Sequence, residues 1–202
     1  MTRLLLATNN AHKVEEYAKL LDTIPVGSLR DYPPMPDVVE DRPDFAGNAI
    51  KKALETHAHT GAITIADDSG LEVTALGGEP GVYSARWVPG TDADRYLTVL
   101  TRMAGVTNRH ARFVCVLAVA GLPEHPLTKG LTRQEGCVIA RGVVDGVINH
   151  GPLGDNGFGY DPIFELPDGR TIAELKADEK HAISHRGRAA RALLPFLRTL
   201  FS

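Results

Sequence analysis

The chain has 202 residues, 43% of them hydrophobic, and a formal net charge of −3 at pH 7. This length is enough for one large domain, or for two small lobes around a shared core. The charge balance excludes a basic face large enough to make duplex DNA or RNA the main partner.

The first predicted element is a buried strand over residues 3–7. Its apolar run is far too short for a signal peptide or a membrane helix, so we expect a soluble cytoplasmic protein with no membrane partner. Residues 11–21 predict a helix, because apolar side chains recur there at helical spacing. This apolar stripe consists of Val14, Tyr17, Ala18 and Leu21.

A lysine, Lys13, stands in the first turn of this predicted helix, where an acidic residue is usual because the helix N-terminus is positive. Either the lysine is solvated, at a cost of about a few tenths of a kcal/mol, or an anion binds there. Free N–H groups at a helix start, together with Asn and Thr donors and an ammonium, make a phosphate site. The candidate residues for such a site are Thr8, Asn9, Asn10 and Lys13.

Residues 31–44 are rich in proline and acidic side chains and predict a loop. A helix is predicted from about Phe45 to His59, with Asp44 as its N-cap. The β-branched residues 62–66 then predict a short strand.

We expect this strand to end at Asp67-Asp68-Ser69-Gly70, and residues 71–76 to form another strand. Asp-Ser-Gly is ordinary turn chemistry, so a solvated turn is one interpretation. A second interpretation is a magnesium site, because Mg²⁺ takes one or two carboxylates and leaves its other positions to water and phosphates. Neighbouring residues of an extended chain point in opposite directions, so only one of the two aspartates is expected to face the metal directly. Glu40 could supply the second carboxylate.

In the middle of the chain, Thr91 and Asp94 predict a capping box for a helix that runs to about Met103. Residues 111–120 and 136–144 predict two long strands joined by a loop. Each strand carries one cysteine, and the spacing of the two is not that of metal ligands. Both are therefore expected to be buried free thiols in a reducing compartment. These cysteines are Cys115 and Cys137.

The stretch GDNGFGYDPIF is glycine-rich and irregular, and Phe158 lies between two of its glycines. The phenylalanine either packs as a hydrophobic residue beneath a loop or stacks on a flat ligand such as a nucleotide base. Asp161, which precedes Pro162, either stabilises the turn or binds a ribose hydroxyl.

The last predicted helix starts at about Ser184 or His185. Its expected apolar face is Ala190, Leu193, Leu194, Leu197 and Phe201. Polar or cationic side chains again gather at a helix start, namely Lys180, Ser184, His185 and Arg186. Cationic side chains therefore stand at two helix starts. Together with the carboxylate pair and the loop aromatic residue, they favour a nucleotide polyphosphate with Mg²⁺ as the ligand. The GxxxxGK[ST] and GxGxxG motifs are missing, so the common nucleotide-binding folds are not indicated.

Four stretches, in chain order, resemble the non-canonical purine nucleoside triphosphate pyrophosphatases, also called the inosine triphosphatase family. They are ATNNAHKVEE, ADDSGLEVTALGGEPGVYSAR, GFGYDPIF and EKHAISHRGRA. The resemblance implies one α/β domain over residues 1–202, an elongated fold with two lobes around a long mixed sheet, an active site in the cleft between them, and a homodimer. It also implies Mg²⁺-dependent hydrolysis of ITP, dITP and XTP to the monophosphate and pyrophosphate.

The resemblance also implies residue roles. The phosphates would be held by Thr8, Asn9, Asn10, Ala11, His12, Lys13 and Lys180. Asp68 would be the catalytic base and, with Glu40, a magnesium ligand. Ser69 would touch the substrate, Phe158, Gly159, Tyr160 and Asp161 would hold base and sugar, and His185 and Arg186 would read the base. Asp41 is an alternative to Glu40 as the magnesium ligand, because VVEDRPDFAGNA matches the family's EETGxTFxENA only loosely.

Two alternatives are a nucleotide-binding sensor without turnover and a related pyrophosphatase for pyrimidine or modified nucleotides. A sensor would need neither Asp68 nor Mg²⁺, so the intact ADDSG stretch argues against it. The pyrimidine alternative requires a different base pocket, and the SHRG stretch counts against it. A donor such as Arg186 would favour the purine 6-oxygen of inosine and xanthosine over the amine of adenine.

Overall fold

The computed structural model describes residues 3–21 and 24–201, without the side chains of Ala11 and His12. The strands are β1 (Leu4–Leu6), β2 (Val26–Ser28), β3 (Thr64–Val73), β4 (His110–Ala120), β5 (Thr132–Gln134), β6 (Cys137–Ile148) and β7 (Phe164–Glu165). The helices are α1 (Ala11–Leu20), α2 (Phe45–Thr60), α3 (Asp92–Arg102), α4 (Ala177–Ile183) and α5 (His185–Phe201). Short 3₁₀ turns connect several of these elements.

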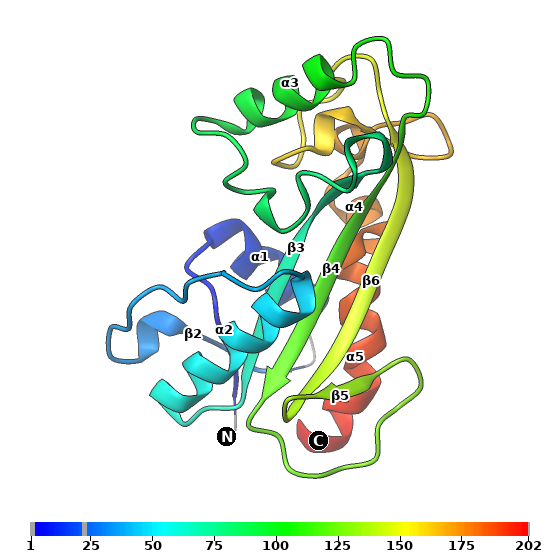
Figure 1. Ribbon diagram of the computed structural model, residues 1–202. Helices are drawn as coiled ribbons and strands as arrows, with labels where there is room; N and C mark the ends of the chain where they lie inside the picture. Colours follow the sequence, from blue (N-terminus) through cyan, green and yellow to red (C-terminus); the bar gives the residue numbers. More distant parts are fainter. Residues whose placement is uncertain (1–2, 22–23, 202) are drawn as a thin grey trace. The chain divides into compact units, whose positions relative to one another are not determined.

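The strands form one mixed sheet in the order β2-β1-β3-β4-β6-β5, with β7 added to β6 (Figure 1). β1 is parallel to both β2 and β3, whereas β6 is antiparallel to β5 and β7. The prediction of an α/β fold around a mixed sheet is therefore confirmed. The parallel pairing brings the carboxyl end of β1 beside β3, which positions the loop before α1 next to the two aspartates.

The chain divides into two compact units, each with its own hydrophobic core. Unit 1 consists of the residues up to Asp68, Cys115–Gly142 and the residues from Arg186 onward. Unit 2 consists of Ser69–Val114 and Val143–His185. The long strands β3, β4 and β6 contribute residues to both units.

In unit 1 the core forms where α1 and α5 pack on the strands. Tyr17 comes from α1 and Leu21 is the residue that follows it, whereas Leu193 and Phe196 come from α5. The prediction of the apolar stripe of α1 is wrong at one position, because Ala18 is exposed, and the polar residue Glu16 is buried instead. Glu16 is buried because it pairs with an arginine of α5, described below. Phe196, fully buried, was missed from the predicted apolar face of α5.

In unit 2 the core combines aliphatic and aromatic side chains of β3, β4, β6, α3 and the irregular segment before β7. Two aromatic residues, Phe113 and Phe164, have ring centroids 4.6 Å apart. The capping box of α3 is present as predicted, since the Thr91 and Asp94 side chains each bond the other's backbone N–H.

The turn expected at residues 67–70 does not form, because β3 runs without interruption through the Asp-Asp-Ser-Gly stretch. The two aspartates do not depend on water to solvate their carboxylates, because both are buried and paired with side chains on helices. Gly70 serves close packing instead: a Cβ at this position would collide with the hydroxyl of Ser84 and the carbonyl of Gly81. The following strand, predicted over residues 71–76, is thus the second half of β3.

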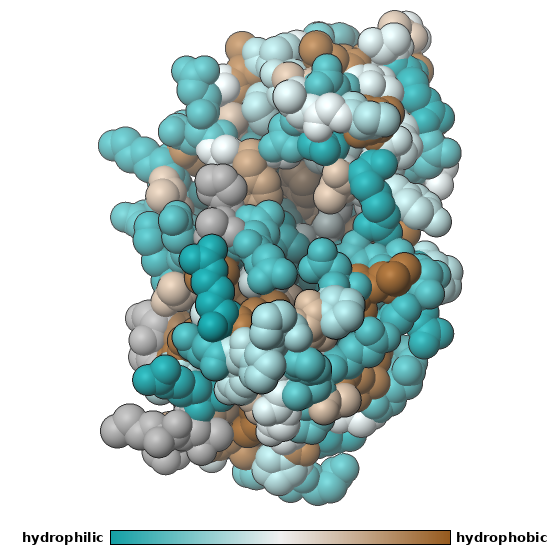
Figure 2. All heavy atoms as spheres, turned by 90° about the vertical axis from the view of Figure 1, so that its left-hand side faces the viewer, coloured by the Kyte–Doolittle hydropathy of each residue, from teal (hydrophilic) through white to brown (hydrophobic). Residues whose placement is uncertain are grey.

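The helix α2 has the predicted start, with the Asp44 carboxylate accepting the Gly47 N–H at 2.7 Å. The short elements β2, β5, β7 and α4 were not predicted. Within the part of the chain that the structure describes, none of the helices has both the length and the apolar character needed to cross a membrane. The face drawn in Figure 2 is largely hydrophilic, with hydrophobic residues in small groups.

Candidate active site

The loop between β1 and α1 is built by local hydrogen bonds. The Thr8 hydroxyl accepts the Asn10 N–H at 3.1 Å, and the Asn10 side chain accepts the Lys13 N–H at 3.3 Å. Asn10 is thus the N-cap of α1. This arrangement places Lys13 in the first helical turn, close to the parallel strand β3. The side chains of Ala11 and His12, predicted to contribute, lie outside the described residues.

Lys13 has an anionic partner within the protein. Its Nζ lies 2.9 Å from Oδ1 of Asp67, whose side chain is 1% exposed. The lysine is therefore not simply solvated. It also has a negatively charged neighbour without any bound ligand. Its side chain is still 19% exposed and lines a cavity, so a bound anion can reach it.

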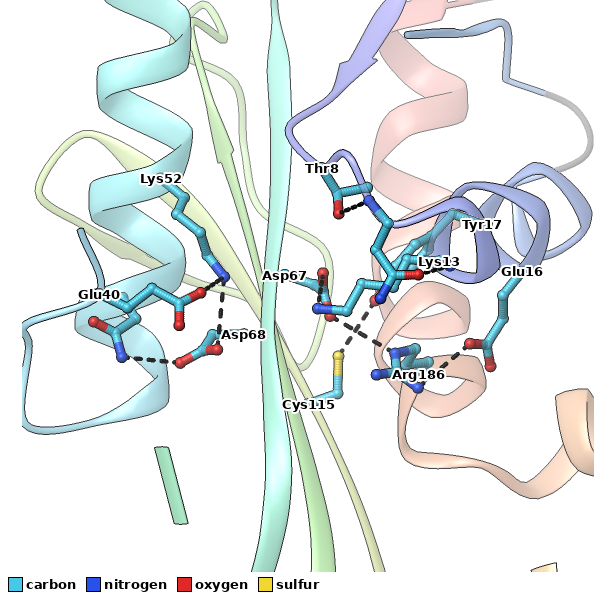
Figure 3. Close-up of polar contacts among 12 residues, drawn as sticks. Thr8, Lys13, Glu16, Tyr17, Glu40, Lys52, Asp67, Asp68, Cys115 and Arg186 are labelled. Atoms are coloured by element: carbon cyan, nitrogen blue, oxygen red, sulfur yellow. Dashed lines mark hydrogen bonds and ion pairs between the residues drawn. The ribbon is translucent and has the colours of Figure 1, made fainter. Parts of the chain in front are cut away.

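Asp67 also belongs to a buried ionic chain that joins α1, β3 and α5 (Figure 3). Arg186 Nε lies 3.7 Å from Asp67 Oδ2, and Arg186 Nη1 lies 3.4 Å from Glu16 Oε2. Burial alone would raise the pKa of Asp67, but the positive charges of Lys13, Arg186 and Lys52 hold it well below its usual range. Asp67 is therefore a fixed anion of the site.

Behind this chain, the Tyr17 hydroxyl and the Cys115 sulfur are 3.5 Å apart. Burial raises the pKa of the Tyr17 hydroxyl, and it raises that of the Cys115 thiol to about 12. Neither group is ionised at neutral pH, so Cys115 is a packing residue and not a nucleophile. Cys115 and Cys137 are both buried free thiols, as predicted.

The next residue, Asp68, points to the opposite side of β3, toward α2 (Figure 3). Its Oδ2 accepts from Asn48 Nδ2 at 3.0 Å, and its Oδ1 lies 3.6 Å from Lys52 Nζ. The Lys52 ammonium is also 2.7 Å from Glu40 Oε1. Burial raises the pKa of Asp68 to about 6, with Lys52 opposing the shift and Glu40 adding to it. A carboxylate with this pKa is suited to take a proton near neutral pH.

The two predicted magnesium ligands fit a hard cation. Glu40 and Asp68 both lie against the same ammonium, so the protein already accommodates a positive charge beside them. Asp41 instead pairs with Lys51 on the surface, at 2.8 Å, and its side chain is 59% exposed. Within residues 3–21 and 24–201, no group of three or more His, Cys, Asp or Glu side chains forms a metal cluster. Two carboxylates suffice for Mg²⁺ when water and phosphates complete its coordination.

Four of the charged side chains described above, Lys13, Asp67, Glu40 and Lys52, line a cavity of about 240 Å³ in unit 1. Its polar lining comprises Thr8, Asn9, Lys13, Asp37, Glu40, Lys52, Thr56 and Asp67. Leu29, Met35 and Val38 from the proline-rich loop add an apolar wall. The cavity therefore combines cationic groups, carboxylates and a helix N-terminus, which together suit a metal-bound polyphosphate.

A second polar cluster lies in unit 2, on the glycine-rich stretch. The Asp161 carboxylate accepts the Phe158 N–H at 2.9 Å and pairs with Lys180 Nζ at 2.7 Å. The same ammonium lies 4.7 Å from the centroid of the half-buried Phe158 ring. Gly157 has φ 82°, and a Cβ there would collide with Asp161. Lys180 was predicted to bind phosphate, and its partner within the protein is this carboxylate.

The remaining predicted residues lie on the glycine-rich stretch, on β3 and at the start of α5. The Gly159 N–H donates to Asp92 at 2.7 Å, and the Tyr160 hydroxyl donates to the Ser84 carbonyl at 2.8 Å. Ser69 is half-buried on β3. The buried His185 ring stacks on Phe113 with centroids 4.8 Å apart, whereas the next residue, Arg186, belongs to the ionic chain of unit 1. The roles of these residues toward a ligand stay predictions.

Comparisons with known proteins identify the family. Residues 4–196 match the model of the Ham1 family. The chain belongs to this family. It is 47% identical to a dITP/XTP pyrophosphatase of Symbiobacterium thermophilum, over 95% of this chain and 93% of that protein. It is 43% identical to a dITP/XTP pyrophosphatase of Exiguobacterium, over 97% of this chain and 99% of that protein. The family resemblance found in the sequence is thus confirmed.

Solved Ham1 structures agree with the fold. The Ham1 protein of Staphylococcus aureus superposes with a TM-score of 0.86 at 35% identity, covering 98% of this chain and all of that one. A HAM1 protein of Coxiella burnetii also gives 0.86, at 38% identity with the same coverage.

Sequence reasoning missed three residues of this Ham1 site: Glu16, Asn48 and Lys52. Asn48 and Lys52 are four positions apart on α2, so they share one helical face. Asn48 stands within the mostly apolar stretch FAGNAI just after the acidic loop, and a polar residue in such a stretch is a signal that could have been used. Glu16 gave no comparable signal, because its partner is 170 positions away in the chain.

Proposed function

We propose that this Ham1 protein hydrolyses non-canonical purine nucleoside triphosphates, namely ITP, dITP and XTP, to the monophosphate and pyrophosphate. Its dITP/XTP pyrophosphatase relatives support this substrate class. The observation that carries the proposal is Asp68, a buried carboxylate with a pKa of about 6, held beside Lys52 and Glu40. A nucleotide-binding sensor would have no use for such a base.

Cleavage between the α and β phosphates needs an in-line water, neutralised phosphate oxygens and a stabilised pyrophosphate leaving group. In this proposal the first-turn N–H groups of α1 and the Lys13 ammonium bind the phosphates, as helix N-termini and lysines do elsewhere. Thr8 and Asn9 add donors at the same cavity. Asp68 orients the attacking water and accepts its proton.

We further propose that the reaction requires Mg²⁺, held by Glu40 and Asp68. When bound, the ion would neutralise negative charge on the phosphate oxygens. Lys52 contacts both carboxylates and keeps them close to a positive charge in the absence of the ion. Glu40 lines the cavity, whereas Asp41 is exposed and is not part of its lining, which supports Glu40 as the second ligand.

The cluster of unit 2 is proposed to bind the base and the sugar. The Phe158 ring offers an aromatic face for stacking, and Asp161 offers a carboxylate for a ribose hydroxyl. His185 and Arg186 are proposed to read the purine 6-oxygen. A buried site that donates to this oxygen can reject the adenine amine by roughly 10⁴-fold.

The oligomeric state and the cellular location of the protein are also proposals. A homodimer is expected from the family resemblance, and analytical ultracentrifugation of the purified chain would measure it. A cytoplasmic location suits an enzyme acting on the nucleotide pool and agrees with two free thiols.

Product analysis tests the proposed function. The purified protein is incubated with ITP, XTP, ATP or a pyrimidine triphosphate, with Mg²⁺ or with a chelator, and products are separated by anion-exchange chromatography. We expect inosine or xanthosine monophosphate and pyrophosphate in a one-to-one ratio, only with Mg²⁺. Orthophosphate and a diphosphate as first products would contradict the proposed bond cleavage. Tight ITP binding without turnover would indicate a sensor, and faster pyrimidine hydrolysis would indicate the other pyrophosphatase class.

A further inference from the structure

Asn48 is a fully buried amide on α2, and both of its ends are hydrogen-bonded. Its Oδ1 accepts the backbone N–H of Arg42 at 3.0 Å, and its Nδ2 donates to Asp68 Oδ2 at 3.0 Å. A backbone N–H can only donate and an ionised carboxylate can only accept. These two partners therefore determine which end of the amide is oxygen and which is nitrogen, so that a flipped amide would lose both bonds.

The Asp68 carboxylate is thus held at both oxygens from one helix. Asn48 binds Oδ2, and Lys52, one turn later, lies against Oδ1. The bond from Asn48 restricts rotation of the carboxylate and leaves Oδ1 on the side of Lys52 and Glu40. Such orientation matters for a base, because a proton is transferred only along a well-aligned hydrogen bond.

The contact between Arg42 and Asn48 depends on Gly47. A Cβ at position 47 would lie 2.8 Å from the Arg42 Cβ and 3.2 Å from its Cγ. The Arg42 Cβ is bonded to the backbone and cannot swing away as a side-chain tip can. A side chain at position 47 would therefore push the Arg42 backbone, with its N–H, away from Asn48. Glycine is unfavourable inside a helix, which makes close approach the reason for its presence here.

We infer that Asn48 is a positioning residue for Asp68, and that the Gly47–Arg42 contact sets the orientation of its amide. Asn48 joins the loop that carries Glu40 to the strand that carries Asp68 by hydrogen bonds, beside the ion pairs that Lys52 makes with both carboxylates. The kinetic consequence rests on the proposed function, but the orientation of the amide does not.

The first experiment uses Gly47→Ala. The melting temperature should fall only slightly, because the better helix propensity of alanine offsets part of the cost of displacing the Arg42 backbone. Displacement of the Arg42 N–H should lower kcat for ITP by about tenfold with KM changed by less than about twofold, because small misplacement of a reacting group costs rate more than binding. An unchanged kcat would overturn the inference.

Two double variants supply the matched comparison. Gly47→Ala with Arg42→Gly removes the Cβ that collides, and it should restore kcat to within about threefold of the wild type. Gly47→Ala with Arg42→Ala loses the same guanidinium but retains the Cβ, and it should stay slow. Equal rates in the two double variants would assign the loss to something other than this contact.

A readout without substrate separates the inference from the proposed function. The side-chain NH₂ of Asn48, assigned in an NMR spectrum by comparison with Asn48→Ala, should exchange slowly with solvent in the wild type. It should exchange at least about tenfold faster in Gly47→Ala and slowly again in the variant with Arg42→Gly. Fast exchange in the wild type would contradict the inference even if ITP is hydrolysed. Slow exchange in a wild type that hydrolyses no nucleotide would leave the positioning intact and contradict only the proposed function.

Discussion

Two neighbouring carboxylates of β3, Asp67 and Asp68, are both buried, yet their pKa values move in opposite directions. Asp67 faces α1 and α5, where Lys13 and Arg186 lower its pKa against the effect of burial. Asp68 faces α2, where burial dominates and raises its pKa to about 6. Strand geometry sends consecutive side chains to opposite faces. Two consecutive residues therefore include a structural anion, Asp67, and a candidate base, Asp68.

The difference comes from the number and sign of the neighbouring charges. Asp67 lies between two cations. Asp68 shares a single cation, Lys52, with a second carboxylate, Glu40. A like charge and desolvation both favour the protonated form, whereas opposite charges favour the ionised form. Four predictions test this contrast.

The largest expected effect is on stability, in Asp67→Asn. Removing this charge leaves Lys13 and Arg186 beside a neutral amide in a buried place, and breaking such a pair costs about 3 kcal/mol of unfolding free energy. Urea unfolding at pH 7 measures the loss. The pKa of Asp67 is lowered on folding, so its contribution is present above its unfolded pKa and is lost as pH falls toward its folded value. A loss that does not shrink on acidification would contradict the ionic interpretation.

The next effect is on rate, in Asp68→Asn. This substitution keeps the side-chain volume but removes the base, so kcat for ITP should fall by about 10²-fold or more. Binding of ITP, measured by calorimetry, should survive. Asp68→Asn is matched by Asp67→Asn, which removes the same charge from the adjacent position. A near-normal rate in Asp68→Asn would exclude Asp68 from the mechanism.

Asp68→Asn should also be more stable than the wild type at pH 7, by about 1–3 kcal/mol, because a pKa raised by burial means that the ionised form opposes folding. The pH dependence of this stability difference follows from the pKa of Asp68, which is raised to about 6. As pH falls from 7 toward the unfolded pKa near 4, the folded wild type takes up a proton and the difference in unfolding free energy should disappear. A difference that grows on acidification would show that the Asp68 charge stabilises the fold.

The smallest effect concerns selectivity, in Arg186→Lys. If Arg186 donates to the purine 6-oxygen, the ratio of kcat/KM for ITP over ATP should fall by about tenfold, the loss of one charge-assisted bond. If the arginine only supports Asp67 and Glu16, both substrates lose rate together and the ratio stays constant. Lysine retains the positive charge beside the two carboxylates, which limits unfolding. Steady-state kinetics on both substrates distinguish these outcomes.

Features with a local physical cause could be predicted from the sequence. The start of α2 after its N-cap Asp44 and the capping box of α3 each depend on a side chain and a backbone within one turn. The expectation that Asp67 and Asp68 face different ways also holds, because alternation is a property of any extended chain.

Features that depend on distant partners could not be predicted. The turn expected at residues 67–70 is wrong because the sequence does not show that Lys13 and Asn48 stabilise two buried carboxylates inside a strand. Glu16 was missed for the same reason, since its partner Arg186 comes from the last helix.

The sequence by itself determined the family, the α/β class, the starts of the main helices and the residue types of the candidate site. These follow from periodicity, capping and motifs, all of which act over a few residues. Only the tertiary structure decided which carboxylate is a fixed anion and which is a candidate base. Ionisation depends on burial and on charges that approach from elsewhere in the chain, such as Lys13, which is 54 positions from its partner Asp67. Desolvation and Coulomb interactions act through space, and that information exists only once the chain is folded.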